Sequence, residues 1–179
     1  MRRKHLLQLA VGAAIAVVVI VPLGALAFIK SGIYDVGAAR PHTKLTEWMT
    51  HETMIHSVRR HAAAEVDPPA SFTRAEAAAG FCEYESHCVA CHGASAIPRE
   101  RWVSGQEPAP PYLLDAPRRF DRAELFWIVD HGIKMTGMPA WRGTMTEQEM
   151  WNTVAFLEGM PKMNAQDYAR WRAQRRCGG

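Results

Sequence analysis

The sequence predicts an all-α protein: one apolar N-terminal helix followed by a larger helical domain. Three observations support this class: an unbroken N-terminal apolar run, helical spacing of apolar residues further on, and two capping-box patterns ahead of apolar runs. We therefore expect four regions. These are an anchor at 1–30, a connector with an amphipathic helix at 31–70, the main helical domain at 71–160, and a basic tail at 161–179.

The length and the charge distribution of the chain indicate how many domains to expect and exclude one class of protein. The 179 residues suit one domain with appendages, and the formal net charge is +3. Four of the 21 Lys and Arg residues precede residue 31, whereas all 18 Asp and Glu residues follow it. The remainder is therefore close to neutral, which is not the charge balance of a nucleic-acid-binding protein.

The N-terminal region combines a basic start with a long apolar run. Arg2-Arg3-Lys4 precedes 24 residues, Leu6 to Ile29, in which Gln8 is the one strongly polar residue. As a helix this run measures about 36 Å, enough to span a bilayer core. The basic cluster should stay in the cytoplasm, so in a bacterium the rest would lie in the periplasm, attached to the inner membrane by a single pass.

A cleaved signal peptide is the competing interpretation of this region. Ala25-Leu26-Ala27 has the form of a cleavage site. The apolar run is longer than an ordinary signal sequence, however, and continues past that site, which favours a retained transmembrane anchor.

The connector contains one expected helix, from Leu45 to Val66, with apolar residues at helical spacing. Two interpretations of it remain open. The helix either packs on its own domain, or lies at the membrane surface or against a partner membrane protein. Asp67-Pro68-Pro69 then ends it.

The main domain opens with a helix that Ser71 can cap, running to about His87, and then reaches Cys88-Val89-Ala90-Cys91-His92. This C-x-x-C-H pattern is typical of covalent attachment of a c-type haem. Two thiols at this spacing can form thioethers with the two vinyl groups of one porphyrin, and the next residue supplies an imidazole to the iron. A zinc site would need a second ligand pair, and a thioredoxin-like site a βαβ setting, so neither fits well.

The rest of the domain alternates loops with two helices. A Gly- and Pro-rich stretch from Gly93 to Pro117 excludes a long regular element, and we expect a bound ligand to organise it. Capping boxes then predict helices after Asp121 and after Thr146, ending near Gly132 and Pro161.

The chain resembles class I monohaem c-type cytochromes, in particular small membrane-anchored bacterial ones. The resemblance covers about 71–160 and rests on four features: G-x-x-x-Y-x-x-x-C-x-x-C-H at 80–92, Pro111-Tyr112-Leu113, Thr-Gly-Met-Pro-Ala-Trp at 136–141, and a final helix with aromatic residues. It implies the class I cytochrome c fold around one covalent haem c. It also implies that the first and last helices cross where Gly80 and Tyr84 meet Trp151 or Phe156.

The same resemblance assigns roles to individual residues. Met138 becomes the distal iron ligand, with Met135 as its rival, and His92 the proximal one. Pro111 is the expected carbonyl partner of the proximal imidazole, with Pro98 second. We also expect Tyr112 and Trp141 to line the haem pocket.

The basic tail carries Tyr168 and Trp171 on a short helix that Asn164 can cap. It is either solvated or docked on the domain through a Cys82–Cys177 disulfide, and the spacing alone does not decide.

With His92 and Met138 both bound to iron, no position is open for substrate, so we expect an electron carrier and not an enzyme. Expected partners are the lipid bilayer and respiratory or photosynthetic redox proteins. The donor would be a quinol–cytochrome c oxidoreductase or a dehydrogenase, and the acceptor a terminal oxidase. The alternative is a fixed haem c subunit of a membrane dehydrogenase or oxidase supercomplex. A haem enzyme or gas sensor would need an open iron site.

Overall fold

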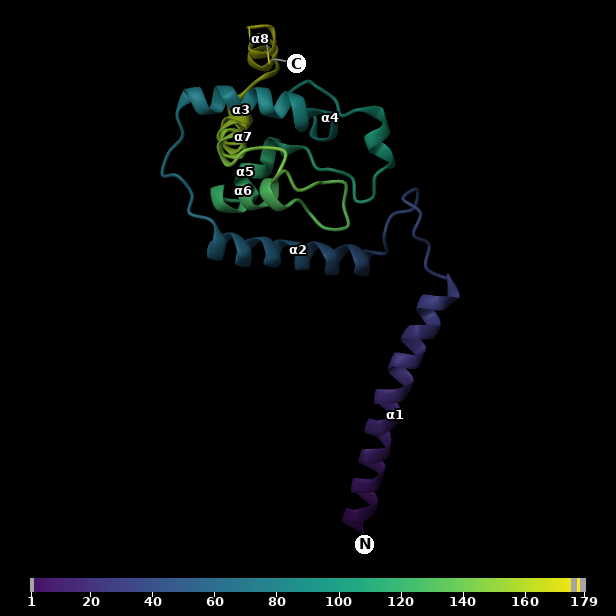
Figure 1. The fold of residues 1–179 in the computed structure, drawn as a ribbon. Coiled ribbons are helices and arrows are strands. Elements are labelled where there is room, and N and C mark those ends of the chain that lie inside the picture. Colours follow the sequence, from purple (N-terminus) through teal and green to yellow (C-terminus); the bar gives the residue numbers. More distant parts are fainter. Residues whose placement is uncertain (1, 175–176, 178–179) are drawn as a thin grey trace. The chain divides into compact units, whose positions relative to one another are not determined.

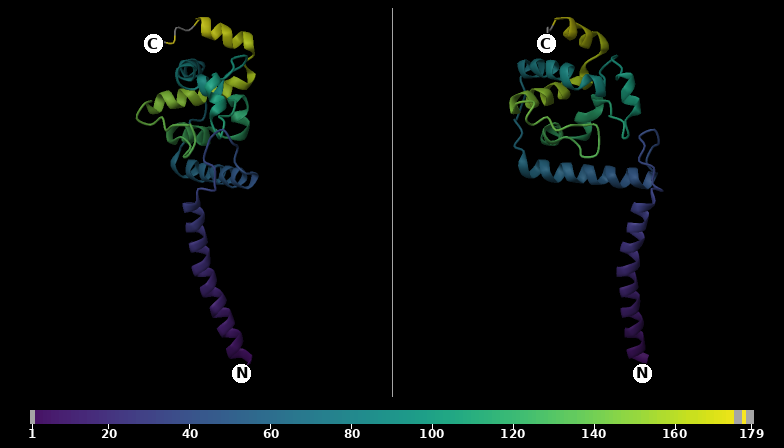
Figure 2. Two further views of the ribbon diagram at one scale, coloured as in Figure 1. Left: turned by 90° about the vertical axis from the view of Figure 1, so that its right-hand side faces the viewer. Right: turned by 45° about the vertical axis from the view of Figure 1, so that its right-hand side comes forward.

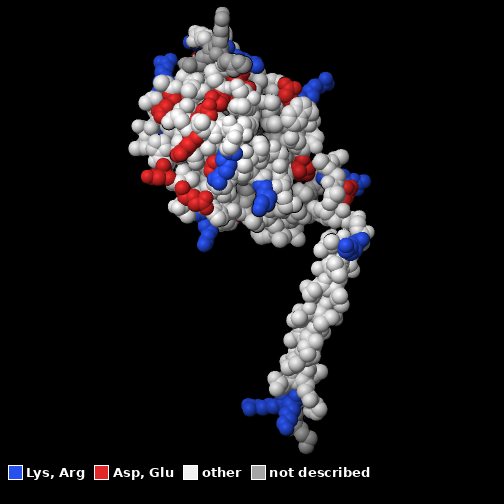
Figure 3. All heavy atoms as spheres, in the orientation of Figure 1, with Lys and Arg blue, Asp and Glu red and all other residues white. Residues whose placement is uncertain are grey.

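The computed structural model describes residues 2–174 and 177, and the chain divides into two compact units, 1–40 and 41–179. The first unit contains α1, Arg2–Ser31, whose apolar side chains are exposed along its length. Among the described residues, α1 is the one helix long and apolar enough to cross a membrane. Figure 3 shows Lys and Arg near its two ends and no charged side chain between them. It therefore fits a single-pass membrane anchor.

The second unit is helical, and its described residues contain no β-strand (Figures 1 and 2). The expected helices are present. They are α2 Lys44–Glu65, α3 Arg74–His87, α6 Arg122–His131, α7 Glu147–Gly159 and α8 Ala165–Gln174. Shorter elements fill the loops between them: α4 Val89–His92, η1 Arg101–Gly105, η2 Leu113–Asp115, α5 Ala116–Arg119 and η3 Met160–Lys162.

Three helices begin with complete capping boxes. Asp121 and Thr146 cap α6 and α7, as predicted. The cap of α3 is Thr73, so the prediction of Ser71 is wrong. The reason is the reciprocal pairing with Glu76: its carboxylate accepts hydrogen bonds from the Thr73 backbone N–H and hydroxyl, and a capping box needs a residue three positions before the acid.

The core is organised by the crossing of α3 and α7, where Gly80 lies directly against the α7 backbone. A Cβ on Gly80 would stand 1.7 Å from the carbonyl oxygen of Asn152, so only glycine allows this approach. Beside it, the rings of Tyr84 and Phe156 pack with centroids 5.2 Å apart. Trp151 instead stacks on Phe126 at 4.1 Å, so of the two aromatic residues expected at the crossing, Phe156 is the one that meets Tyr84.

The C-terminal helix is docked on the domain. Tyr168 of α8 is fully buried, its ring packs 5.3 Å from that of Phe81, and its hydroxyl donates to Glu85 of α3. Cys82 and Cys177 form a disulfide that ties the chain end to α3. Arg175 and Arg176, which belong to the predicted basic tail, lie outside the described residues.

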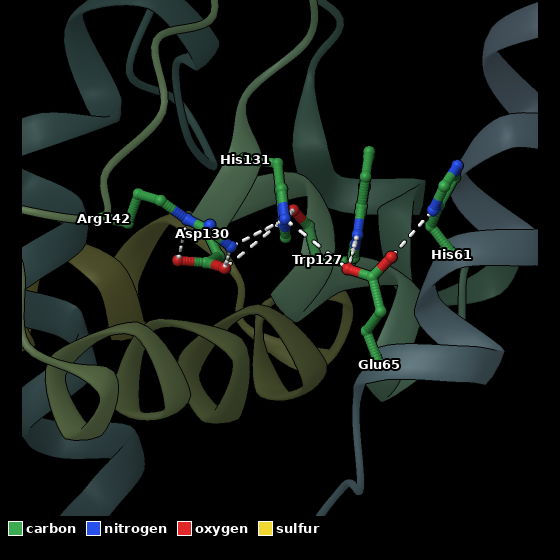
Figure 4. Close-up of polar contacts among 6 residues, drawn as sticks. All are labelled: His61, Glu65, Trp127, Asp130, His131 and Arg142. Carbon is green, nitrogen blue, oxygen red and sulfur yellow. Dashed lines mark hydrogen bonds and ion pairs between the residues drawn. The ribbon is translucent and has the colours of Figure 1, made fainter.

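The C-terminal half of α2 packs on α6, where it buries Val58 and Ala62. A polar network reinforces this contact (Figure 4). The Glu65 carboxylate accepts a hydrogen bond from the Trp127 indole at 3.2 Å and pairs with His61 at 2.7 Å. The Trp127 ring in turn lies between His61 and His131, with centroid distances of 5.7 and 4.3 Å. The helix predicted in the connector is thus part of the second unit.

Glu65 should make this docking sensitive to acid. The hydrogen bond with His61, followed by that with Trp127, holds the pKa of Glu65 below its ordinary value. A depressed carboxyl pKa stabilises the folded contact above the ordinary pKa, and this contribution is lost as the pH falls through the lowered value. We expect Glu65→Gln to increase amide hydrogen exchange in the last turns of α2 severalfold near neutral pH.

The control for this prediction is Glu47→Gln, at an exposed position in the first turn of the same helix. Exchange in α3 and α7 should be unchanged in both variants. Equal exchange in the last turns of α2 for Glu65→Gln and the parent protein would contradict the prediction.

Candidate haem-binding site

The C-x-x-C-H residues lie at a break between two helices. Cys88 ends α3 and precedes α4, and its carbonyl accepts hydrogen bonds from the backbone N–H of Cys91 and of His92. This tight turn brings both thiols and the imidazole into a single helical turn. Cys88 and Cys91 are half-buried free thiols, in contrast to the paired Cys82 and Cys177. The attachment sulfurs are therefore available for covalent chemistry.

The Cys88 sulfur lies in an apolar setting. Burial raises the pKa of its thiol to about 12, with smaller contributions from Cys91 and Glu83. A group in this position is neutral at physiological pH. A thioether is also neutral, so the site accommodates alkylated sulfur without burying a charge.

His92 is oriented by a backbone carbonyl nineteen residues away. Its side chain is buried, and its Nδ1 lies 2.8 Å from the carbonyl oxygen of Pro111. Because a carbonyl only accepts, Nδ1 must carry the proton, which leaves the lone pair of Nε2 for a metal. Burial lowers the pKa of His92; the Pro111 hydrogen bond opposes this effect and the nearby Arg99 adds to it.

Side-chain contacts hold the segment around Pro111 in place. The Arg99 guanidinium donates to the carbonyl of Pro110 and stacks over the Tyr112 ring at 4.4 Å. Tyr112 is about half exposed, and a Cβ on Gly93 would stand 2.7 Å from its ring. The loop after His92 is thus packed back onto the end of the attachment motif.

A second loop presents Met138. Gly132 ends α6 with φ of 65°, and a Cβ there would stand 2.5 Å from the Pro139 backbone, so both the conformation and the space require glycine. The loop closes on itself, because the Ile133 N–H donates to the Met138 carbonyl and the Met138 N–H to the Thr136 hydroxyl. Met138 is half-buried in this loop.

The rival methionine has a different environment. The side chain of Met135 is 93% exposed, and its backbone has φ of 61°. Its thioether therefore lies in solvent, whereas that of Met138 is partly enclosed.

Two polar side chains near these loops lack partners. The indole Nε1 of Trp141 and the Oε1 of Gln106 are both buried. Among the described residues the indole N–H has no acceptor and the amide oxygen has no donor. Gln106 lies against Gly137 of the Met138 loop, and Trp141 packs 4.9 Å from His87, one residue before Cys88. Buried polar atoms rarely stay unpaired, so the Trp141 indole N–H indicates a bound group with a hydrogen-bond acceptor. The Gln106 Oε1 is itself an acceptor and would need a donor, which a carboxylate does not offer.

The residues present therefore fit a haem. They offer two free thiols, a neutral imidazole with an available Nε2, and a half-buried thioether. A buried indole donor can serve a propionate carboxylate. Gln106 was not among the predicted site residues, because a single amide in a Pro-rich loop carries no sequence signal for its place against the Met138 loop.

Comparison with known families agrees with this geometry. Residues 75–157 match the family model described as cytochrome c oxidase, cbb3-type, subunit III. No curated protein and no solved structure matches the chain significantly. The matched segment begins in α3, contains the attachment motif and the Met138 loop, and ends within α7. Residues 75–157 therefore belong to the monohaem c-type cytochromes, and their cofactor is covalently bound haem c.

Proposed function

We propose that this protein is a membrane-anchored electron-transfer cytochrome c of the bacterial periplasm. It would pass electrons between redox proteins of the same membrane, with a quinol–cytochrome c oxidoreductase or dehydrogenase as donor and a terminal oxidase as acceptor. The observation that carries the proposal is the hydrogen bond from buried His92 to Pro111, which leaves Nε2 available to iron. Bound haem supplies a one-electron Fe(III)/Fe(II) couple.

Residues of the protein would hold the haem and set its reduction potential. Cys88 and Cys91 would fix the haem covalently, and His92 and Met138 would bind its iron. A neutral thioether ligand favours the reduced iron and raises the potential. Tyr112 and Trp141 would flank the cofactor, with the Trp141 indole donating to a propionate.

Two features support a periplasmic location of the haem domain. The Cys82–Cys177 disulfide needs an oxidising compartment to persist. Arg2, Arg3 and Lys4 at the start of α1 favour a cytoplasmic N-terminus, and the residues after α1 would then lie on the other side of the membrane.

A second candidate function is that of a fixed haem c subunit in a membrane oxidase or dehydrogenase complex. The match to a family named for an oxidase subunit favours it. Purification in mild detergent separates the two. A free carrier would elute as a monomer, and a subunit would elute with its partner proteins, which mass spectrometry identifies.

Met138→Ala tests the distal ligand. Axial ligands set haem potentials over a range of about 0.8 V, so we expect a clear negative shift, loss of the sulfur-to-iron charge-transfer band and binding of CO to the ferrous protein. Redox titration and absorption spectra of the purified holoprotein measure these changes. Met135→Ala, at the exposed position, is the matched control and should leave all three properties unchanged. The opposite pattern would make Met135 the ligand.

A further inference from the structure

The first two turns of α2 expose a small apolar surface. Leu45, Trp48 and Met49 are 64%, 61% and 53% exposed, and they share one face because they are three and four residues apart. We refer to these three side chains as the Leu45 patch. Single exposed apolar residues are common, but three large ones together on one helix face indicate an interaction surface.

The core of its own domain does not cover the Leu45 patch. The residues that α2 buries against α6 are Val58 and Ala62, in its C-terminal half. At 100° per residue, Leu45 and Met49 lie about 100° and 140° round the helix from Ala62. Trp48 lies about 40° from Ala62 in this projection, but it precedes it by nearly four turns and is 61% exposed. Figure 1 shows the N-terminal half of α2 continuing beyond the part that lies along α6. The packing of α2 on α6 therefore leaves the patch available.

The length of the preceding chain limits what the patch can meet. The anchor helix ends at Ser31 and α2 begins at Lys44, so twelve residues connect them. Such a segment spans at most about 40 Å when fully extended. If α1 is in the bilayer, the Leu45 patch is held at high effective concentration beside the membrane surface.

The charges near the patch favour a neutral surface over a highly charged one. Lys44 and Glu47 flank it with opposite charges, and Glu52, one turn further on, faces His51 and His56 at 3.7 Å each. No excess of one sign surrounds the apolar residues. Tryptophan, with an apolar ring and a polar N–H, concentrates at the boundary between lipid headgroups and hydrocarbon.

We propose that the Leu45 patch inserts into the headgroup region of the bilayer, so that the start of α2 is a second, peripheral membrane contact. The proposal rests on α1 being a membrane anchor. The patch and the anchor together restrict the orientation of the haem domain over the membrane, because α2 is joined to α6 through its buried residues and Glu65. The tether alone would leave that orientation free.

Spin labels on the intact holoprotein test this contact. The four native cysteines are held in thioethers and the disulfide, so an introduced cysteine is the one free thiol for a nitroxide. Leu45→Cys and Met49→Cys report on the patch. Two exposed positions of α2 are the matched controls: Thr50→Cys, about 100° or more round the helix from each patch residue, and Ala64→Cys, in the last turn. Each variant is reconstituted alone into phosphatidylcholine vesicles, and its collision rates with oxygen and with a water-soluble nickel chelate are measured.

At positions 45 and 49 we expect oxygen accessibility to exceed that of the nickel chelate, with the order reversed at positions 50 and 64. High salt should not change this result, because the contact is apolar. Equal, water-like accessibility at all four positions in vesicles that carry the protein would overturn the interface and leave the carrier function intact.

Two other outcomes would also overturn the proposal. In the first, both oxygen and the nickel chelate are excluded from positions 45 and 49, and the spectra show spin–spin broadening that disappears when unlabelled protein is added. This result would identify a second copy of the chain as the occupant of the patch. Protein that does not float with the vesicles would overturn the anchor itself, and with it both the interface and the membrane-bound function. The haem absorption spectrum of each sample verifies that the domain is folded.

Discussion

Gly80→Ala should prevent the domain from packing. The added Cβ would overlap the Asn152 carbonyl oxygen at 1.7 Å and approach the Thr153 nitrogen at 2.8 Å, and both atoms belong to the backbone of α7. A flexible side chain can move aside, but a helix backbone can yield only by separating α3 from α7. The better helix propensity of alanine, worth about 1 kcal/mol, does not offset this clash. We expect a loss of about 3 kcal/mol or more in the free energy of unfolding.

Denaturant unfolding of the holoprotein, followed by circular dichroism, measures the effect of Gly80→Ala. Gly159→Ala is the matched control, because it makes the same substitution in α7 at a position where no atom of a neighbouring element lies within 4 Å of the added carbon. It should be neutral or slightly stabilising. Comparable stabilities of the two variants would mean that α3 and α7 do not cross at Gly80.

Replacing both Cys88 and Cys91 by alanine should abolish covalent haem and the folded domain with it, and each single variant should retain at most one thioether link. The physical reason lies in the two loops that face the cofactor. They are rich in Pro and Gly and contain the unpaired indole N–H of Trp141. Without the cofactor their apolar contacts and hydrogen bonds are incomplete, so the free energy of folding becomes unfavourable.

Haem staining after denaturing electrophoresis, with circular dichroism of the same preparations, tests this prediction. Cys82→Ser combined with Cys177→Ser is the control. That pair closes a loop of 95 residues, and its loss should cost up to about 4 kcal/mol of stability while the haem remains attached. A folded, doubly linked product from the Cys88 and Cys91 variants would overturn the attachment site.

Local chemistry in the sequence determined most of the secondary structure and the attachment motif. Capping boxes join residues three positions apart, so Asp121 and Thr146 could be recognised directly as the starts of α6 and α7. The C-x-x-C-H pattern is equally local, because two thiols and an imidazole must reach one cofactor from a single helical turn. The long apolar run marked α1 for the same reason, since its signal lies within one continuous segment.

Contacts between distant segments were decided by the tertiary structure alone. The resemblance put Pro111 first and Pro98 second as the partner of His92, and packing of the loop onto the attachment motif brings the Pro111 carbonyl to His92. Likewise, Phe156 rather than Trp151 meets Tyr84. The α7 backbone meets Gly80 at Asn152, and Phe156, four residues later, lies on the same face of α7.

The same holds for the position of α2 and for the unpaired amide of Gln106. Helical spacing predicted α2 but not which of its residues would be covered. The two halves of α2 differ: α6 covers the C-terminal half, whereas the Leu45 patch in the N-terminal half is exposed. Gln106 faces Gly137 across thirty residues of loop and helix. Such contacts depend on the summed packing of many side chains, whereas caps, turns and attachment motifs depend on neighbours within one turn.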